Sequence, residues 1–463
     1  MSEPKIAIIG AGISGLATAY FLAQHGLRSV LIEKSNRVGG LVQTCHLDGC
    51  VLEAGADSYL AAKPSITELA RELPGLDEQI IGSNDAARRV FIVRDSRLVP
   101  LPRGMVMMVP GDLPAALRSS LFSTKTKLRF LTEPLARPCT REKDVSVGEF
   151  IGGHFGPELV DYVAEPLLAG VYGGHSASLS APSVLPRFVD YERAYGSLIR
   201  AVRKERRQST GGLFRSFRDG MQTLTDALAR QAQVHQAEAQ RIESWNGRWR
   251  VHYGQEQMDV DDLVLACPAH AAAVLLESLS PSLACDLAAI PYSSAMLVSL
   301  VYQRSKVAHP LDGFGFLVPE SERRTIAAAT WVNTKFPSRI PPGLVALRAF
   351  IVADRAVELA GTPEPELIEL VRSDFARTMG LQAAPQFSTV HAWPRSMPQY
   401  IVGHQERIGR ITAGLREFPG LYLAGNAYDG IGLPDCVRLA KETAKRIHAS
   451  KFRERIFTNI QIN

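Results

Sequence analysis

The chain has 463 residues, a length sufficient for about two or three domains. With 46% hydrophobic and 21% charged residues its composition is that of an ordinary soluble protein, and a formal net charge of +5 excludes the bulk basicity of nucleic-acid-binding proteins. No apolar run reaches the roughly 18 residues of a spanning helix, and Met1–Lys5, with an acid and a proline, lacks the pattern of a signal peptide.

The N-terminal segment has the order strand, glycine turn, helix, strand and acid. Residues 5–9 form a short apolar run typical of a strand buried on both faces. Residues 16–24 form an apolar helical run that stops near Gly26, and residues 29–32 form a second buried strand that ends at Glu33. This order predicts a dinucleotide-binding unit.

The turn itself carries Gly10, Gly12 and Gly15, in the spacing GxGxxG. The first glycine allows a tight turn, the second lets the backbone approach a pyrophosphate, and the third lets the helix pack close to the strand. Free amides and the positive end of the helix dipole then face a phosphate. Glu33 follows Gly15 by 18 residues, where its carboxylate can accept hydrogen bonds from ribose hydroxyls. The alternative is a glycine turn in an ordinary α/β domain.

Residues 33–40 extend this motif with Arg37 and the glycine pair Gly39 and Gly40. The extension resembles the second signature of the glutathione-reductase-like FAD proteins, especially the amine oxidase and protoporphyrinogen oxidase branch. The resemblance implies that the glycine pair brings backbone beside the pyrophosphate and ribityl chain, and that Arg37 faces phosphate. The alternative is a surface turn with a solvated arginine.

Residues 51–59 read as a strand that enters the glycine turn Gly55–Ser58. In the flavin oxidase branch a similar turn, usually Gly-Pro-Asn-Ser, passes beside the isoalloxazine ring. Here Asp57 stands where an amide is usual. We expect Asp57 to cap the helix that opens near Pro64 and to have a positioning role; the alternative is proton transfer from a substrate N–H.

The next segment is predicted to contain a hairpin and then helices. Residues 89–93 and 98–101 flank Asp95 and Ser96, as in a hairpin. The methionine-rich residues 102–110 are predicted to be core, with a wall for a large flat ligand or a lipid surface as alternatives. Residues 112–210 look mostly helical; their basic stretch 200–207 is interpreted as a solvated helix face, with contact to anionic lipid as the alternative.

The second half of the chain is predicted to alternate between two domains. Strands are expected at residues 234–242, 249–253, 262–265, 296–302, 313–318, 325–332 and 344–352, and a helix at 364–379. Residues 420–436 again give a strand, a glycine turn and a helix with a proline near its start, which aims amides at an anion or a ring carbonyl. Both ends of the chain are therefore expected to build one site.

The domain prediction follows from this alternation. We expect an α/β fold: an FAD-binding, Rossmann-like domain of glutathione-reductase/amine-oxidase type (1–92, 212–289 and 402–450), a mainly helical insertion (93–211) and an α+β substrate domain (290–401). The six cysteines form no CxxC pair, so free thiols, no disulfide and no metal are expected; they are Cys45, Cys50, Cys139, Cys267, Cys285 and Cys436.

Over nearly its whole length the chain resembles the protoporphyrinogen oxidase family, which includes enzymes that act one step earlier, on coproporphyrinogen III. The more specific motifs are residues 170–174 with 179–180, residues 313–319, residues 393–400 and residues 425–436. Residues 102–107 and the Pro434–Cys436 ending look like the bacterial coproporphyrinogen branch. The two substrates are not separated by these motifs.

The resemblance implies an FAD-dependent, oxygen-using enzyme of heme biosynthesis. A methylene bridge carbon of a reduced tetrapyrrole gives a hydride to flavin N5 while a pyrrole N–H loses a proton, and repetition yields the porphyrin. Oxygen reoxidises the flavin and yields peroxide. No single catalytic base is evident. The implied location is the cytoplasm; peripheral contact with the inner face of the membrane, handover to the next pathway enzyme, and a monomer or homodimer are left open.

The resemblance also assigns residues. The cofactor-binding residues would be Gly10, Ala11, Gly12, Ile13, Ser14, Gly15, Glu33, Lys34, Arg37, Gly40, Leu41, Gly55, Ala56, Asp57, Ser58, Ala239, Trp393, Gly425, Asn426, Ile431, Gly432 and Leu433. Among them, Ala239 would contact the adenine through its backbone, and Trp393 would pack beside the cofactor or be plain core.

The substrate-binding residues implied are Arg103, Gly173, Phe314, Leu317 and Phe350. Phe314 and Leu317 would wall the macrocycle, or else pack within a strand. Arg103 would pair with a propionate, because a carboxylate-bearing ligand needs a cation. Gly173 would let substrate approach the backbone, and Phe350 occupies a strand position where relatives often carry methionine.

Two other functions compete with this one. The first is a flavin oxidase acting on an amine or a carotenoid precursor: Tyr428 is present for an amine cage, but no cysteine motif for covalent FAD is visible. The second is a non-catalytic flavin-binding or scaffold protein. The lack of a second glycine phosphate loop argues against NAD(P) as a partner.

Overall fold

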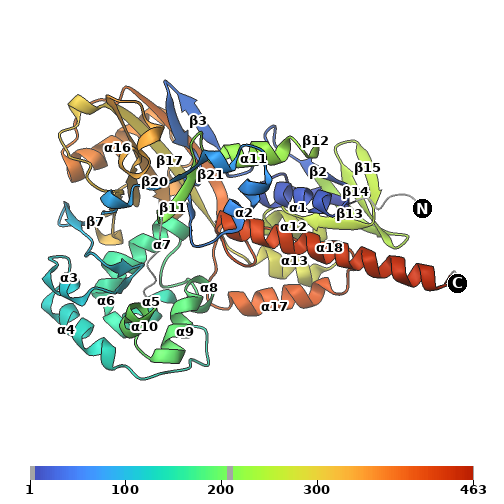
Figure 1. Cartoon of the computed structure of the whole chain (residues 1–463), viewed down its shortest axis with the longest axis horizontal. Coiled ribbons are helices and arrows are strands. Elements are labelled where there is room, and N and C mark those ends of the chain that lie inside the picture. Colours follow the sequence, from blue (N-terminus) through green and yellow to red (C-terminus); the bar gives the residue numbers. More distant parts are fainter. Residues whose placement is uncertain (1–5, 206–211, 462–463) are drawn as a thin grey trace.

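The computed structural model describes residues 6–205 and 212–461, the residues beyond 452 by their backbone alone. The part that carries the N-terminal glycine turn is built on a parallel five-stranded sheet, on the right of Figure 1. The strand order is β12 (Gln233–Gln236), β2 (Ser29–Glu33), β1 (Ile6–Ile9), β16 (Asp262–Leu265) and β22 (Leu421–Leu423). Because its strands come from three distant stretches of chain, this discontinuous part takes shape only in the folded protein.

Both faces of this sheet are covered, which explains why β1 is apolar throughout. Ile6 and Ile8 pack with α1 (Ile13–Gln24) and α18 (Leu433–Gln461) on one face. The alternate residues, Ala7 and Ile9, pack on the other face with α12 and α13 and with the antiparallel sheet of β13, β14 and β15. The bounds of these elements are α12 Ala269–Leu276, α13 Pro281–Ala288, β13 Ala239–Trp245, β14 Arg248–Tyr253 and β15 Glu256–Val260.

A seven-stranded mixed sheet forms the second region, at the upper left of Figure 1. Its order is β21 (Phe387–Pro398), β17 (Tyr292–Gln303), β20 (Leu344–Val352), β19 (Ala328–Trp331), β18 (Gly315–Leu317), β7 (Val90–Arg94) and β8 (Arg97–Pro100). The predicted helix at residues 364–379 is present as α16 (Glu364–Met379), which packs on this sheet through Leu367, Val371 and Phe375.

The β7–β8 hairpin corrects one predicted domain boundary. The boundary at residues 92 and 93 falls inside β7, and β7 pairs in parallel with β18. The hairpin therefore belongs to the seven-stranded sheet and to neither of the domains predicted for its two strands. Asp95 and Ser96 both have positive φ angles, of 52° and 58°, as a tight two-residue hairpin turn requires.

The third region is helical, as predicted, and lies at the lower left of Figure 1. It contains α3 (Leu113–Arg118), α4 (Thr124–Thr132), α5 (Val147–Phe155), α6 (Pro157–Leu159), α7 (Glu165–Tyr172), α8 (Ala181–Val184), α9 (Pro186–Tyr195) and α10 (Leu198–Lys204). Its core is aromatic, with Phe130, Phe150 and Phe155 fully buried. The methionine cluster is split, since Met108 is buried in this core whereas Met107 is exposed.

Shorter elements join the three regions. They are β3 (Thr44–Leu47), β4 (Cys50–Glu53), β5 (Tyr59–Leu60), β6 (Ile80–Gly82), β9 (Met105–Val106), β10 (Val109–Pro110), β11 (Phe214–Phe217), α2 (Ser65–Glu72), α11 (Gln222–Ala229), α14 (Val332–Lys335), α15 (Ala353–Glu358) and α17 (His404–Leu415). All six cysteines are free thiols. Within residues 6–205 and 212–461, no helix combines the length and apolarity needed to span a bilayer. The predictions for Met1–Lys5, and for Arg206 and Arg207 of the basic stretch, lie outside the described residues.

A buried histidine makes the fold sensitive to acid. His404, at the start of α17, is only 2% exposed and stacks on Tyr400, with ring centroids 4.0 Å apart. Burial lowers the pKa of His404 from 6.5 to about 4. Between these two pH values the unfolded chain holds a proton that the folded protein does not, so the free energy of unfolding falls as the pH falls.

We therefore expect a His404→Phe variant, which keeps the stacking but cannot titrate, to lose part of the pH dependence of stability. His404 contributes at most about 1.4 kcal/mol per pH unit between pH 6.5 and 4. Urea unfolding at pH 7 and pH 5 measures the difference for both proteins. If the wild type and the variant lose the same unfolding free energy between pH 7 and pH 5, His404 is not a source of the pH dependence.

Candidate active site

A large cavity runs from the glycine turn of the five-stranded sheet to the inner face of the seven-stranded sheet. Its volume is about 1900 Å³. Typical small-molecule pockets measure roughly 300–1,000 Å³, so this cavity has room for a dinucleotide and a second large molecule together. Its walls come from Gly10, Gly12, Phe314 and Phe350, among many others.

The glycine turn has the geometry expected for phosphate binding. Gly10 has a φ of 103°, and a Cβ atom on Gly15 would lie 2.0 Å from the Gly10 carbonyl oxygen, so helix and turn touch through backbone. Helix α1 starts after Gly12 with no side-chain cap, which leaves amides of its first turn for a ligand. The Ala11 amide donates to Glu33 Oε2 at 2.7 Å and so ties the acid to the turn.

The second glycine motif is held by Arg37. The guanidinium donates to the carbonyl oxygens of Val38 (2.8 Å), Val42 (3.0 Å) and Gly40. Arg37 lines the cavity, but these hydrogen bonds are to its own loop. The arginine thus shapes the loop whose backbone approaches Gly12, where the amide of Gly39 donates to the Ala11 carbonyl at 2.8 Å. That Arg37 faces phosphate stays a prediction.

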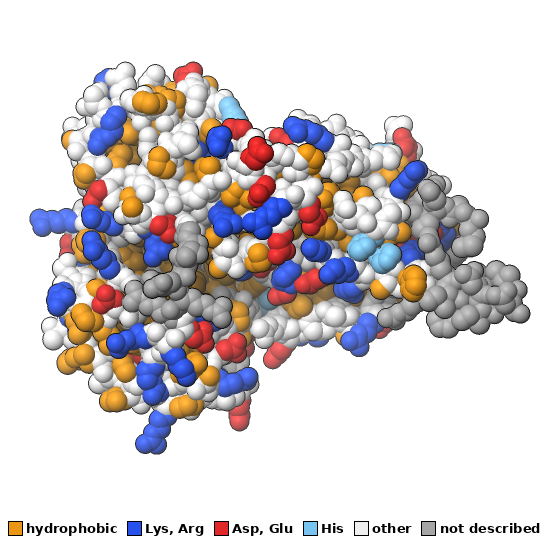
Figure 2. All heavy atoms as spheres, in the orientation of Figure 1, with side chains coloured by type: hydrophobic (Ala, Val, Ile, Leu, Met, Phe, Trp, Pro, Cys, Tyr) orange, Lys and Arg blue, Asp and Glu red, His pale blue; other side chains and the backbone are white. Residues whose placement is uncertain are grey.

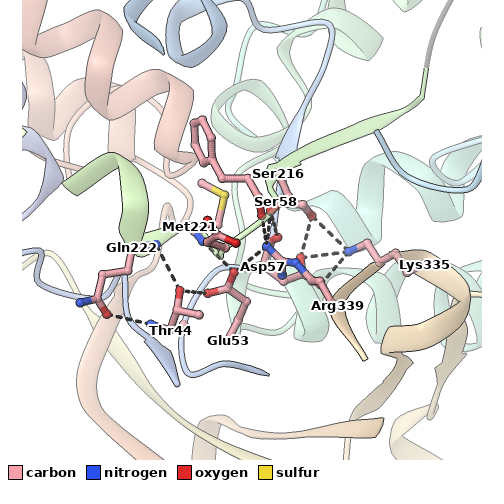
Figure 3. Close-up of polar contacts among 12 residues, drawn as sticks. Thr44, Glu53, Asp57, Ser58, Ser216, Met221, Gln222, Lys335 and Arg339 are labelled. Carbon is pink, nitrogen blue, oxygen red and sulfur yellow. Dashed lines mark hydrogen bonds and ion pairs between the residues drawn. The ribbon is translucent and has the colours of Figure 1, made fainter. Parts of the chain in front are cut away.

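Asp57 does not cap a helix, which corrects that prediction. Helix α2 starts after Pro64 and has no side-chain cap. Instead the Asp57 carboxylate accepts two hydrogen bonds from Lys335 Nζ, at 2.8 and 2.9 Å, and one from Ser58 Oγ at 2.6 Å (Figure 3). Burial alone would raise its pKa, but Lys335 and Arg348 hold the pKa of Asp57 well below its usual range. An acid that stays ionised so firmly is a poor proton acceptor, so a positioning role is favoured.

A second buried ion pair lies beside the first. Glu53 and Arg339 are 2.8 Å apart, with both side chains 1% exposed. Glu53 also accepts from the Met221 amide (2.8 Å) and from Thr44 Oγ1 (2.7 Å), and Arg339 donates to Ser216 Oγ (2.7 Å) (Figure 3). These contacts anchor the strand that leads into the Gly55 turn to the start of α11 and to the segment after α14.

The predicted substrate wall is largely assembled. Phe314, Leu317 and Phe350 all line the cavity from the seven-stranded sheet. Gly170 of α7 faces them, since a Cβ atom placed on it would lie 3.7 Å from Leu317 Cδ2. Trp393 lines the same space and donates through Nε1 to the Ala54 carbonyl at 2.6 Å. Together these side chains make an apolar slot beside the Gly55 turn.

The C-terminal segment reaches the cavity as predicted. Its lining residues are Gly425, Asn426, Ile431, Gly432 and Leu433. Because α18 begins at Leu433, the positive end of this helix also lies at the cavity. The other predicted cofactor residues that line the cavity are Ile13, Ser14, Glu33, Lys34, Gly40, Leu41, Gly55, Ala56, Asp57, Ser58 and Ala239.

Four predicted site residues do not line the cavity: Ala11, Gly15, Arg103 and Gly173. The first two shape the turn from behind. Arg103 is exposed, in the loop before β9. Gly173 ends α7 with a φ of 62°, and a Cβ atom on it would lie 2.6 Å from Ser293 Oγ, so it serves packing. The amine-cage residue considered above, Tyr428, is likewise absent from the lining, which removes support for that alternative.

Several lining residues were missed at the sequence level, chiefly Lys335, Arg348 and Gly170. Arg348 carried a readable signal: it is a lone cation inside the apolar strand Leu344–Val352, and such a buried charge requires a partner. Lys335 gave no such signal, because it follows the polar residues Asn333 and Thr334 in a short segment, α14.

The chain is similar to known proteins along nearly its whole length. A family model described as flavin containing amine oxidoreductase matches residues 13–448. A coproporphyrinogen III oxidase of Staphylococcus aureus (strain NCTC 8325 / PS 47) is 30% identical over 96% of this chain and 99% of its own. A mitochondrial protoporphyrinogen oxidase of Nicotiana tabacum is 28% identical over 93% of this chain and 92% of its own. The crystal structure of a protein from Exiguobacterium sp. 255-15 has a TM-score of 0.87 at 30% identity, covering 97% of this chain and all (100%) of the other.

Proposed function

Because the chain belongs to the family of flavin containing amine oxidoreductases, we propose that it is an FAD-dependent oxidase that converts a porphyrinogen into the porphyrin in heme biosynthesis. The family match confirms the predicted fold class and the predicted flavin cofactor. The proposal of a porphyrinogen as substrate is supported by the similarity, along nearly the whole of both chains, to relatives named for this reaction.

Between the two porphyrinogens we propose coproporphyrinogen III. The relatives that bear this name are 30–31% identical, whereas the tobacco protoporphyrinogen oxidase is 28% identical. A cavity of about 1900 Å³ with a flat apolar wall fits a macrocycle held beside a dinucleotide. We propose in addition that oxygen accepts the electrons.

The residues present suit this chemistry. Bound FAD would supply the hydride acceptor. The amides of the Gly10–Gly15 turn and the start of α18 would hold its diphosphate, and Glu33 would accept from ribose hydroxyls. Phe314, Leu317 and Phe350 would orient the macrocycle and exclude water. Asp57, kept ionised by Lys335, would position without accepting the pyrrole proton.

Peripheral membrane contact, with handover of the product to the next pathway enzyme, is proposed for the helical region. Leu128, Leu131 and Leu135 are 57%, 52% and 79% exposed, on and just after α4, and Lys125 lies on the same helix. Figure 2 shows hydrophobic side chains between Lys and Arg side chains over this part of the surface. Apolar side chains mixed with cations suit the surface of an anionic membrane.

The function is tested by porphyrin fluorescence. In air, the FAD-loaded protein is expected to convert coproporphyrinogen III into fluorescent porphyrin faster than protoporphyrinogen IX, with peroxide formed alongside. Flavin-free protein is the control for spontaneous oxidation. If neither substrate gains fluorescence above this control, the proposed function is wrong; fluorescence without peroxide would instead contradict oxygen as the acceptor.

A further inference from the structure

Five charged side chains are buried together around the Gly55–Ser58 turn. They are Glu53, Asp57, Lys335, Arg339 and Arg348. Each side chain is at most 17% exposed. Two carboxylates therefore face three cations, which leaves a surplus of one positive charge inside the protein. A buried charge without a counter-charge is costly, so the position of the surplus matters.

The Glu53–Arg339 pair does not hold the surplus. Both side chains are 1% exposed and directly paired; Glu53 also accepts hydrogen bonds from Thr44 and Met221, and Arg339 also donates to Ser216. Neither residue lines the cavity. This pair is closed and electrically neutral.

The surplus lies with the other three side chains, all of which line the cavity. Asp57 is shared by two cations: Lys335 Nζ lies 2.8 Å from one of its oxygens, and Arg348 Nη1 lies 3.5 Å away. Arg348 also donates to the Gly55 carbonyl, a neutral acceptor. Glu53 also acts on Arg348, but Glu53 is already paired with Arg339. Burial lowers the pKa of Lys335 despite Asp57, as expected of an incompletely balanced ammonium.

We propose that Lys335 and Arg348, held by Asp57, form a binding site for one negative charge of the molecule that occupies the cavity beside the Gly55 turn. The identity of the two candidate anions rests on the proposed function. One is a carboxylate of the tetrapyrrole. The other is the negative charge that a flavin ring carries after two-electron reduction. Both place an anion against the cavity wall where the protein supplies an extra cation.

The test uses the FAD-loaded Lys335→Met protein. This variant leaves Asp57 paired one-to-one with Arg348, so it should fold. Arg348→Met, which leaves Asp57 paired with Lys335, is the second variant in case the first does not fold. Lys306→Met, which removes an exposed lysine that does not line the cavity, is the matched control.

Two readouts distinguish the anions. The first is binding of coproporphyrin III against binding of its uncharged tetramethyl ester, followed by absorbance. If a substrate carboxylate occupies the site, the variant binds the acid about tenfold or more weakly and the ester unchanged. The second is the midpoint potential of the flavin. If the reduced flavin ring occupies the site, the variant binds reduced FAD about tenfold or more weakly than the wild type does. This lowers the two-electron midpoint potential of the flavin by about 30 mV.

Unchanged porphyrin affinity together with an unchanged potential, in either folded variant, would overturn the proposal. Failure of the proposed function looks different: wild-type protein that neither binds porphyrin nor oxidises porphyrinogen would refute that function. The potential measurement would still decide whether the surplus cation acts on the flavin.

Discussion

A Gly12→Val protein is expected to fold but to lose its flavin. A Cβ atom added at Gly12 would meet no protein atom closer than Gly40 Cα, at 3.9 Å, and its φ of −70° is open to any residue. The branched side chain would instead enter the cavity at the start of α1, where the diphosphate is proposed to lie. Overpacking of this kind costs about 1–3 kcal/mol, which corresponds to roughly 5- to 150-fold weaker flavin binding.

The measurement is the flavin released by acid per mole of purified protein, with circular dichroism as the check on folding. Gly409→Val is the matched control, because a Cβ atom at Gly409 has no neighbour within 4 Å and this residue does not line the cavity. A folded Gly12→Val protein that retains full flavin would show that the proposed diphosphate position is wrong.

Replacing Arg339 with methionine is expected to destabilise the protein by about 3–5 kcal/mol, because removing one partner of a buried pair leaves an uncompensated charge. Burial already raises the pKa of Glu53, against the pull of Arg339. Without the arginine, Glu53 can shed its charge only by taking up a proton. The loss should therefore grow as the pH rises above neutrality, where that proton is harder to hold.

Urea unfolding of Arg339→Met measures this loss. The matched control is Arg410→Met, which breaks an exposed pair with Asp286 at 2.7 Å and should cost no more than about 1 kcal/mol. Adding Glu53→Gln to the first variant removes the stranded charge and should restore part of the stability. Equal effects of Arg339→Met and Arg410→Met would mean that burial does not strengthen the inner pair.

Local signals in the sequence predicted local structure well. The glycine spacing, the flanking apolar runs and Glu33 specified the βαβ unit, and the structure joins Ala11 to Glu33 as that motif requires. The periodic run from Glu364 to Met379 matched α16 at both ends. Each of these features depends on residues close together in the chain, whose spacing decides which atoms meet.

Long-range partners decided the rest. Asp57 had the local pattern of a helix cap, but its carboxylate accepts a hydrogen bond from a lysine 278 residues away. The β7–β8 hairpin was correctly predicted as a hairpin, whereas the sheet it joins depends on pairing with β18 more than two hundred residues later. Arg103 had the right charge for a propionate but lies outside the cavity lining.

The sequence by itself determined the phosphate-binding turn, the apolar faces and the existence of one shared site. These features follow from the conformational freedom of glycine and from the spacing of apolar residues along the chain. Only the tertiary structure decided which charges meet beside the cavity, since a buried ion pair depends on the three-dimensional distance between side chains that no local pattern contains. The surplus cation at Lys335 and Arg348 is of this second kind.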